Sequence, residues 1–487
     1  MKKFLLFSIV CLFAIRSANA QATAIQTNTF ASFQEAVGHF RADKIHLAAP
    51  IFTSLYRSID QEVAANHQLY VQELSYYVMA CALRQNDRST VASAKQFISE
   101  EKNEVWVARL SYELATYYFS KEMYADALPY YEKAGIAHLS NAQIIQSKFR
   151  QAYCLFYLQR FNAAKPFFAG ILQLKDHPLV ADAHYYYGFI LFAERNYPLA
   201  LRSFDTLIAH PTYGRVVPFY LASIYHAQDE NNKALQVAIS ALNKNDVIYK
   251  KELQQLAGHI YYEQQAFGDA LPFLEGYQAA SDKISREDQY KLSVCYFETG
   301  KQDQAIKGFQ QLSGSEDALS QSAMYLLAKA YLQKGEKENA RNAFGFCAAN
   351  NSNAAQREIA LFYYSKLSYE LGYQGLALSE LRKFLQLFPS SALKQEATEL
   401  LVAVLSATNN YRDALQLMEG LASFTDETKK LYPVILYGRA AELINDQQFD
   451  QAEQLLDKIL STASNTSVLS LTYFWKGEIM MQKGSAD

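Results

Sequence analysis

The sequence predicts an all-α fold built from one repeated helical hairpin, and three observations support this class. Hydrophobic residues make up 50% of the 487 residues and charged residues 20%, which is enough apolar material for a large core. Only 19 Gly and 10 Pro interrupt the chain. A short pattern centred on an alanine also recurs at a nearly constant interval. We therefore expect one extended array of repeats rather than several globular domains.

The N-terminus has the pattern of an export signal. Lys2 and Lys3 precede an apolar run over residues 4–15, and Ala-Asn-Ala at 18–20 supplies the small residues of a cleavage site. We therefore expect a signal peptide over 1–20 and an exported protein, in the periplasm or at the outer membrane of a Gram-negative bacterium. An uncleaved anchor is the alternative, but the run is short for a membrane span. No later stretch is apolar enough for a transmembrane segment of the mature chain.

The composition of the mature chain excludes some function classes. Without the leader the chain has 43 basic and 49 acidic residues, a net charge of −6. Binding of nucleic acid needs a clustered basic face, so we expect no nucleic-acid partner. Cys81, Cys154, Cys295 and Cys347 remain after cleavage and lack the paired spacing of zinc sites.

The repeat is defined by its alanine, here called the anchor, which recurs every 34 to 38 residues. An earlier copy is centred on Ala48 and a degraded one lies near Ala92. We expect divergent repeats over 21–105, a tandem array over 106–466, and the first helix of a truncated further repeat over 467–487. The ten anchors in register are Ala127, Ala164, Ala200, Ala234, Ala270, Ala305, Ala340, Ala377, Ala414 and Ala452.

Each copy predicts two helices of about twelve to fourteen residues, because the conserved offsets of three, four and seven place residues on one helical face. The first helix has a small residue twelve before the anchor and a large apolar residue nine before it. The second helix has a large apolar residue four after the anchor, such as Phe204, and an apolar residue seven after it. We expect the large residue of one helix to fill the notch left by the small residue of the other.

Gly and Pro mark the ends of these helices. Gly300, Gly335 and Gly372 lie five residues before their anchors, where a left-handed cap would end the first helix. Pro residues two after an anchor are predicted to lie in the first turn of the second helix, where proline is tolerated. These residues are Pro50, Pro129, Pro166 and Pro272.

The period, the small-then-aromatic first helix and the alanine-centred second helix resemble tetratricopeptide repeats over roughly residues 30–485. The usual tryptophan of the repeat is mostly missing, although a Trp–Gly pair occurs at Trp475 and Gly477. The resemblance implies a right-handed α-solenoid whose first helices line a concave surface. It also implies protein partners, held without catalysis.

No catalytic motif, phosphate-binding loop or cofactor motif occurs, so we expect no enzyme, no cofactor and no metal site. His184, His226 and His259 lie on three successive first helices but are not expected to converge. Cys154 and Cys295 occupy equivalent positions four repeats apart, too distant for a disulfide, and are expected to be core residues.

The offsets that face inward in this family are mostly aromatic, and they predict a partner-binding stripe. Burial of these rings between neighbouring repeats is the alternative. The two inner bases, Lys329 and Lys366, are too few to predict a grip on a C-terminal carboxylate. The predicted binding residues are Tyr112, Phe119, Phe149, Tyr153, Phe156, Tyr185, Phe189, Phe192, Phe219, Tyr262, Tyr290 and Phe297.

Two other functions remain open. One is a glycan-binding or cell-wall-binding solenoid, in which the rings stack on sugars and Glu263, Glu298 and Glu370 supply polar contacts. The other is an accessory subunit of an envelope assembly or secretion machine. The main prediction is a non-catalytic interaction scaffold of the cell envelope.

Overall fold

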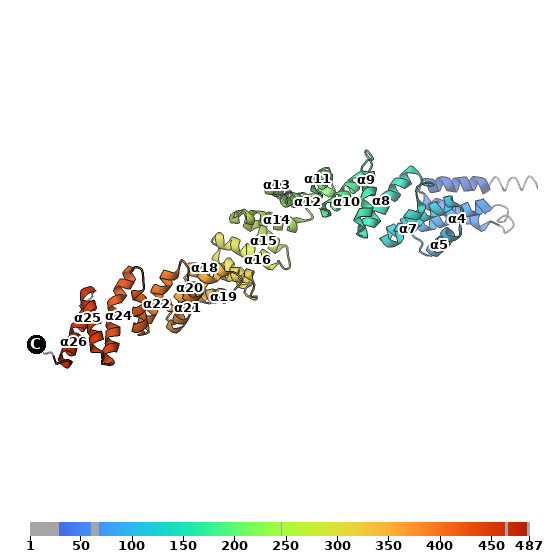
Figure 1. The fold of residues 1–487 in the computed structure, drawn as a ribbon. Coiled ribbons are helices and arrows are strands. Elements are labelled where there is room, and N and C mark those ends of the chain that lie inside the picture. Colours follow the sequence, from blue (N-terminus) through green and yellow to red (C-terminus); the bar gives the residue numbers. More distant parts are fainter. Residues whose placement is uncertain (1–28, 60–67, 245, 463–465, 485–487) are drawn as a thin grey trace, which may run out of the picture. The chain divides into compact units, whose positions relative to one another are not determined.

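The computed structural model describes residues 29–59, 68–244, 246–462 and 466–484 (Figure 1). These residues form helices and connecting turns, and no strand occurs among them, which confirms the all-α class. No helix within these ranges is long and apolar enough to cross a membrane. The predicted signal peptide lies outside the described residues.

The chain divides into two compact units, residues 1–228 and 229–487, which are described separately. The expected start of the tandem array, at residue 106, is not a boundary of either unit and falls inside the first turn of a helix. Unit 1 contains a helix over 29–41, α2 (Ile45–Arg57), α4 (Gln68–Arg84), α5 (Thr90–Glu100), α6 (Glu104–Ser120), α7 (Tyr124–Ala134), α8 (Asn141–Tyr157), α9 (Phe161–Ile171), α10 (Leu179–Ala193), α11 (Tyr197–Asp205), the 3-10 helix η1 (Tyr213–Arg215) and α12 (Val217–Ala227).

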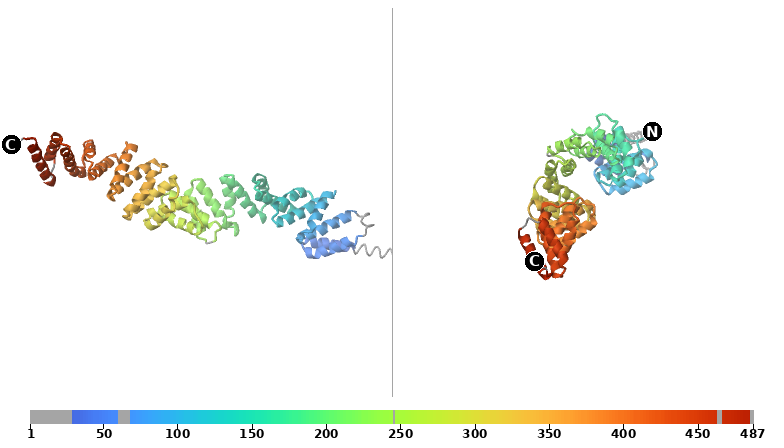
Figure 2. Two further views of the ribbon diagram at one scale, coloured as in Figure 1. Left: turned by 90° about the horizontal axis from the view of Figure 1, so that it is seen from below. Right: turned by 60° about the vertical axis from the view of Figure 1, so that its left-hand side comes forward.

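Unit 2 continues the same succession of helices, and Figure 2 shows the helical pairs from two further directions. Its helices are α13 (Asn231–Leu242), α14 (Lys250–Glu263), α15 (Phe267–Ala279), α16 (Arg286–Glu298), α17 (Gln302–Gln310), α18 (Ala318–Gln333), α19 (Lys337–Ala349), α20 (Ala354–Glu370), α21 (Gln374–Leu387), α22 (Lys394–Ala407), α23 (Tyr411–Glu419), α24 (Asp426–Asn445), α25 (Phe449–Thr462) and α26 (Thr466–Gln482). α26 agrees with the first helix predicted at the C-terminal end.

The anchors lie where the repeat pattern predicts them. Ala48 and all ten anchors in register are fully buried, each on the second helix of its pair. In the degraded copy the buried alanine is Ala94, whereas Ala92 is exposed. The anchor of that copy is therefore two residues later than the sequence pattern indicated.

The predicted notch-and-knob packing is confirmed inside the pairs. A Cβ atom added to Gly188 would lie 2.9 Å from the ring of Phe204, four residues after its anchor. A Cβ atom added to Gly258 would lie 2.6 Å from the side chain of Leu274, at the same offset. Such distances are shorter than van der Waals contact, so glycine at these positions lets the two helices approach.

The turn inside each pair has a constant geometry. Gly300, Gly335 and Gly372 have φ values of +78°, +79° and +85°, as predicted for left-handed caps. Other copies adopt the same conformation without glycine, for example Gln159 at +58°. In that turn the Arg160 N–H donates to the Leu155 carbonyl at 2.8 Å, which satisfies a free carbonyl at the helix end.

The prediction for the prolines is wrong by one turn. Pro129 is the sixth residue of α7, which begins at Tyr124, and Pro50, Pro166 and Pro272 also lie inside their helices. The second helices begin three residues before the anchor, earlier than the sequence pattern indicated. Each of these helices therefore gives up one backbone hydrogen bond.

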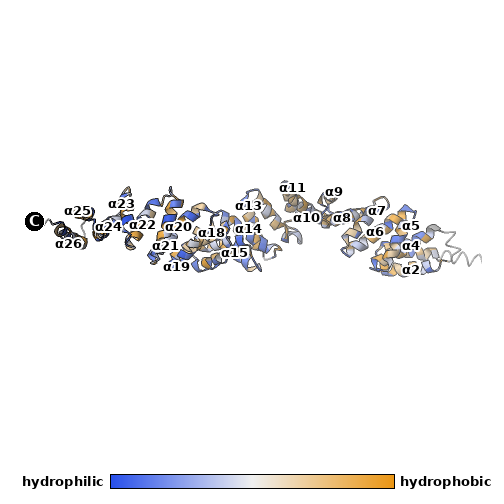
Figure 3. Ribbon diagram, turned by 60° about the horizontal axis from the view of Figure 1, so that its bottom comes forward, coloured by the Kyte–Doolittle hydropathy of each residue, from blue (hydrophilic) through white to orange (hydrophobic). Residues whose placement is uncertain are grey.

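Apolar and hydrophilic residues occur on the same helices, as expected for amphipathic helices that cover a core (Figure 3). The residues four after the anchor are the centre of that core, and Phe168, Phe204 and Phe309 are fully buried. Since a single hairpin buries only part of its apolar surface, each pair is stabilised by its neighbours.

Candidate partner-binding site

The twelve predicted aromatic residues are buried or half-buried rather than exposed. Tyr112, Phe149 and Phe297 are 5%, 8% and 7% exposed, and the other nine are half-buried. Burial between repeats, the alternative weighed for this stripe, therefore accounts for much of its surface. Nine rings keep part of their surface in contact with solvent.

Two tyrosines that the sequence pattern missed explain this burial. The ring centroid of Tyr186 lies 5.2 Å from that of Tyr153 and 5.0 Å from that of Phe156. Tyr220 lies in the same way 5.9 Å from Phe189 and 5.4 Å from Phe192. Both tyrosines are fourteen residues before an anchor, one position beyond an inner-facing offset. The sequence shows that both tyrosines occupy the same offset, but it does not show that this offset contacts the preceding repeat.

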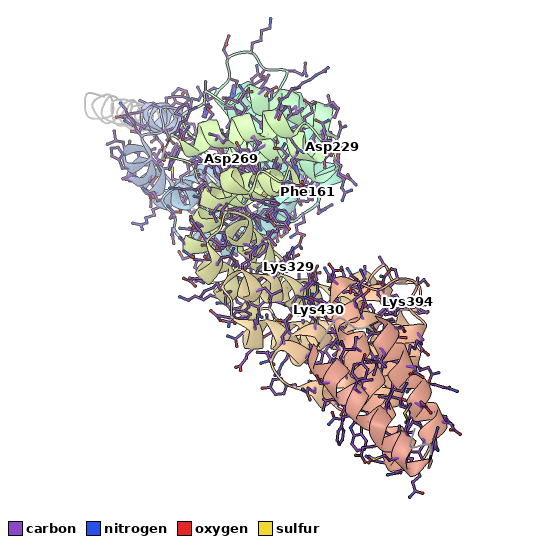
Figure 4. All side chains as sticks on the ribbon, turned by 90° about the vertical axis from the view of Figure 1, so that its left-hand side faces the viewer. Phe161, Asp229, Asp269, Lys329, Lys394 and Lys430 are labelled. Carbon is purple, nitrogen blue, oxygen red and sulfur yellow. The ribbon has the colours of Figure 1, made fainter. Side chains whose placement is uncertain are left out.

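In unit 2 the stripe residues contact their own second helices and nearby lysines. Tyr262 lies 5.7 Å from Phe267 and Tyr290 lies 6.2 Å from Phe309, measured between ring centroids. Lys329, labelled in Figure 4, lies on α18 with its ammonium nitrogen 5.7 Å from the ring centroid of Phe297. These rings of unit 2 therefore pack mainly against neighbouring side chains of the protein.

The acidic residues proposed for sugar binding are exposed, but the rings beside them are not. Glu263, Glu298 and Glu370 are exposed, whereas Phe297, next to Glu298, is buried. Glu370 also forms an ion pair with Lys337 at 2.7 Å. Sugar stacking needs an open ring face, which Phe297 does not present.

A cleft of about 470 Å³ lies in unit 1, where the stripe is interrupted. The stripe position eleven residues before the anchor is Thr116 in this copy, whereas the next two copies have Tyr153 and Phe189 there. The smaller side chain leaves space between the first helices α4, α6 and α8. The cleft is lined by Asp43, Ile45, Leu83, Arg84, Asn86, Tyr112, Glu113, Thr116, Tyr117, Ser120, Gln143, Gln146 and Arg150.

One wall of the cleft is a buried ion pair. Arg84 donates from Nε and Nη2 to the two oxygens of Glu113 at 2.8 and 2.5 Å, and from Nη1 to Asp43 at 3.1 Å. The Glu113 side chain is only 2% exposed, so it requires such a partner. Burial alone would lower the pKa of Arg84, but the hydrogen bond and the charge of Glu113 raise this pKa overall. The pair is rigid and its charges are satisfied.

The opposite wall holds a second arginine with neutral partners. Arg150 donates from Nη1 to the Thr116 hydroxyl at 3.0 Å and to the Tyr131 hydroxyl at 3.4 Å. Its guanidinium carbon lies 5.3 Å from the ring centroid of Phe119, close enough for a cation–π contact. Tyr112 donates to the Gln146 amide oxygen at 3.2 Å and closes the cleft between the two walls.

The lining of this cleft contains no cysteine or histidine, although Cys81 lies near the Arg84–Glu113 pair. Cys81, Cys154, Cys295 and Cys347 are free and buried, and burial raises the pKa of each thiol to about 12. In the described part of the chain, no group of three or more His, Cys, Asp or Glu residues is placed to hold a metal ion.

Of the three histidines considered above, His259 has a clearly defined polar environment. Its Nε2 lies 2.6 Å from Oδ1 of the buried Asp288. Its Nδ1 lies 3.4 Å from Nζ of Lys291. Burial first, then the positive charge of Lys291, lowers the pKa of His259, so the ring is neutral near pH 7. The neutral ring donates from Nε2 to Asp288 and accepts from Lys291 at Nδ1.

Comparison with known proteins agrees with the repeat pattern. Residues 289–314 and 322–345 match the tetratricopeptide repeat family. The other copies share the register of this segment, so the chain carries tetratricopeptide-type repeats, as predicted. This fold typically serves as a non-catalytic scaffold for protein interaction. No curated protein matches the chain.

Solved structures with a similar succession of helices include three repeat proteins. YrrB, described as a TPR protein with an unusual peptide-binding site, is 16% identical, covers 40% of this chain and 96% of its own, and has a TM-score of 0.33. A tetratricopeptide repeat protein from Parabacteroides merdae is 16% identical over 54% of this chain and 99% of its own, with a TM-score of 0.31. The apo form of RapI is 15% identical over 68% of this chain and 98% of its own, with a TM-score of 0.36.

Proposed function

We propose that this chain is a non-catalytic scaffold of the cell envelope that binds segments of partner proteins on its first helices. The observation that carries the proposal is the cleft between α4, α6 and α8. It combines open volume, polar walls and the edges of two buried tyrosines, Tyr112 and Tyr117, on successive packed helices. A rigid surface loses little conformational entropy when a partner binds, which favours affinity.

The lining of the cleft suits an extended peptide. The side-chain oxygens of Gln143 and Gln146 accept hydrogen bonds from Ser140 and Tyr112, which leaves the amide NH2 groups of both residues to donate to a peptide backbone. Phe119, half-buried beneath Arg150, offers apolar contact beside them. An extended segment presents both backbone polar groups and side chains, so it matches a surface of mixed character better than a sugar or a small apolar ligand does.

The absence of a catalytic role is supported by the chemistry of the reactive side chains. The four thiols are buried with a pKa of about 12, so they are not nucleophiles at neutral pH. The neutral His259 is hydrogen-bonded to Asp288 and Lys291 in a packed interface. Both groups have structural partners that account for their positions.

The envelope location rests on the pattern of residues 1–20. If the leader directs export, the protein works in the periplasm or at the outer membrane, where an accessory role in an assembly or secretion machine suits a rigid scaffold. Fractionation of cells that express the epitope-tagged full chain tests the location. Recovery of the protein in the cytosol, with residues 1–20 still attached, would contradict the proposal.

The binding site is tested by photocrosslinking in cells. We place benzoylphenylalanine at Gln146 inside the cleft and, as a control, at the exposed Gln395 on α22. Partners captured at position 146 but not at 395 are expected to be lost when Thr116→Trp fills the cleft. If Thr116→Trp folds normally and leaves the captured partners unchanged, the cleft is not the binding site.

A further inference from the structure

We propose that Arg150 recognises the carboxylate of an aspartate or glutamate side chain within an extended segment of the partner. This inference rests on the proposed function and names the chemistry that the cleft selects. It depends on three features of the described residues. Neighbouring side chains orient Arg150, no carboxylate forms an ion pair with it, and the facing wall carries a net negative charge.

Arg150 is held in place from two sides. Thr116 and Tyr131 accept hydrogen bonds from Nη1, and Phe119 lies under the guanidinium plane. Tyr131 is fully buried four residues after its anchor, so its hydroxyl is a fixed point of the core. These contacts orient the guanidinium and occupy only part of its five donors.

The charge of Arg150 has no internal counterpart. Arg84, in the same cleft, is paired with Glu113 and Asp43, whereas no carboxylate among the described residues forms an ion pair with the half-buried Arg150. A partly desolvated cation is costly without an anion, so the free protein lacks a partner that a ligand can supply. The planar fork of arginine matches a carboxylate with two parallel hydrogen bonds.

The facing wall limits how much negative charge the ligand can carry. Glu113 has both oxygens engaged by Arg84, but Asp43 leaves that wall with one excess negative charge. A phosphate or a run of acidic residues would meet this charge, since a phosphate group carries nearly two negative charges. A single carboxylate set at Arg150, with backbone contacts to Gln143 and Gln146, fits both walls.

The test uses libraries of blocked nonapeptides, acetylated and amidated, with a fixed central residue and random flanks. The full chain is immobilised, and retained peptides are identified by mass spectrometry. We expect libraries centred on Glu or Asp to be retained about tenfold more than those centred on Gln or Asn, the usual effect of one charge-assisted contact. The preference should weaken as salt concentration rises.

Four variants assign the preference to the residue. Arg150→Gln should abolish the acidic preference, although the variant should still retain peptides. Arg150→Lys keeps the positive charge but lacks the two parallel donors of the guanidinium, so it should show only part of the preference. Thr116→Val removes an acceptor that orients Arg150 and should reduce the preference without removing charge. Lys329→Gln is the control in unit 2, where an exposed cation lies beside an aromatic ring, and should change nothing. Circular dichroism checks that each variant is folded.

The outcomes separate this inference from the proposed function. If peptides are retained with no acidic preference, or Arg150→Gln keeps the preference, the inference is wrong and the peptide-binding function stands. A parallel library with a free C-terminal carboxylate and a central Gln also tests the inference, which is overturned if that library is retained better than the blocked library centred on Glu. If no library is retained, both the inference and peptide binding in this cleft fail.

Discussion

Two seams between neighbouring repeats, one in each unit, are held by different chemistry although the repeats share one hairpin geometry. In unit 1 the contacts of α10 with α8 and of α12 with α10, here called the aromatic seam, are made by Tyr186 and Tyr220 against the rings of the preceding repeat. The helices α4, α6 and α8 around the cleft are joined instead by an ion pair and hydrogen bonds. In unit 2 the seam between α14 and α16, here called the polar seam, is made by Gln255, His259, Asp288 and Lys291. Lys291 and the two tyrosines occupy the same offset from their anchors.

The comparison shows that neighbouring repeats can pack through unlike side chains while the hairpin pattern stays the same. Ring contacts depend on area and shape and respond weakly to pH or salt. The polar seam depends on a buried carboxylate: Asp288 accepts from Gln255 at 3.1 Å and from Ser285 at 2.7 Å, besides its contact with His259. Its stability therefore depends on protonation. Further along unit 2, Gln321 of α18 donates to the backbone carbonyls of Asn350 and Asn353, between α19 and α20, both at 3.0 Å.

The largest effect should come from breaking the aromatic seam. Tyr220→Ala removes a ring that is 5% exposed and contacts Phe189, Phe192 and Phe204, so we expect a loss of about 3–5 kcal/mol in local stability. Hydrogen exchange of amides in α10 and α12 measures it. Tyr56→Ala, at a ring that is 44% exposed, is the control and should cost at most about 0.5 kcal/mol. Equal exchange in both variants would show that the rings do not hold the seam.

Acid should loosen the polar seam and spare the aromatic one. Burial alone would raise the pKa of Asp288, but hydrogen bonds from Ser285, Gln255 and His259 lower it overall, so its contribution is present above the unfolded pKa and is lost below about pH 4. Burial and Lys291 lower the pKa of His259, so protonation below the unfolded value near 6.5 also opposes folding.

Exchange of α14–α16 amides should therefore speed up progressively from about pH 6.5 downward, relative to α10–α12, with a total effect on the order of 1 kcal/mol. His259→Gln should remove the upper part of this pH dependence and leave the part due to Asp288. Identical pH profiles for the two seams, after correction for intrinsic exchange rates, would contradict the comparison.

The smallest effect on stability should come from substitutions at the positive-φ residue of the turn inside a pair. In unit 1 the turns of the copies in register reach positive φ at this offset without glycine, as at Gln159, whereas unit 2 uses glycine at Gly300, Gly335 and Gly372 and other residues elsewhere, as at Gln265. We expect Gln159→Gly to change stability by less than about 1 kcal/mol, because relief of left-handed strain is offset by entropy. Gly335→Ala, without that offset, should destabilise by about 1 kcal/mol. Urea unfolding of both variants measures the difference, and a larger loss in Gln159→Gly would reverse the assignment.

The hairpin was predictable from the amino-acid sequence because its periodicity is local. Spacings of three, four and seven residues identify the faces of a helix without knowledge of its neighbours, so the buried anchors, Phe204 in the notch of Gly188 and the glycine caps were all predictable. Where the pattern is weak, the prediction shifted: Ala94 replaces Ala92, and the prolines lie one turn deeper in their helices.

The roles of the residues at the inner-facing offsets depend on contacts between repeats. The same offset carries Thr116 beside a cleft, Phe189 against Tyr220 and His259 on a buried carboxylate. These roles depend on which side chain the neighbouring repeat supplies, and that side chain is about 30 residues away in sequence. Periodicity gives the face of a helix, whereas burial, charge pairing and open volume arise only when two such faces meet.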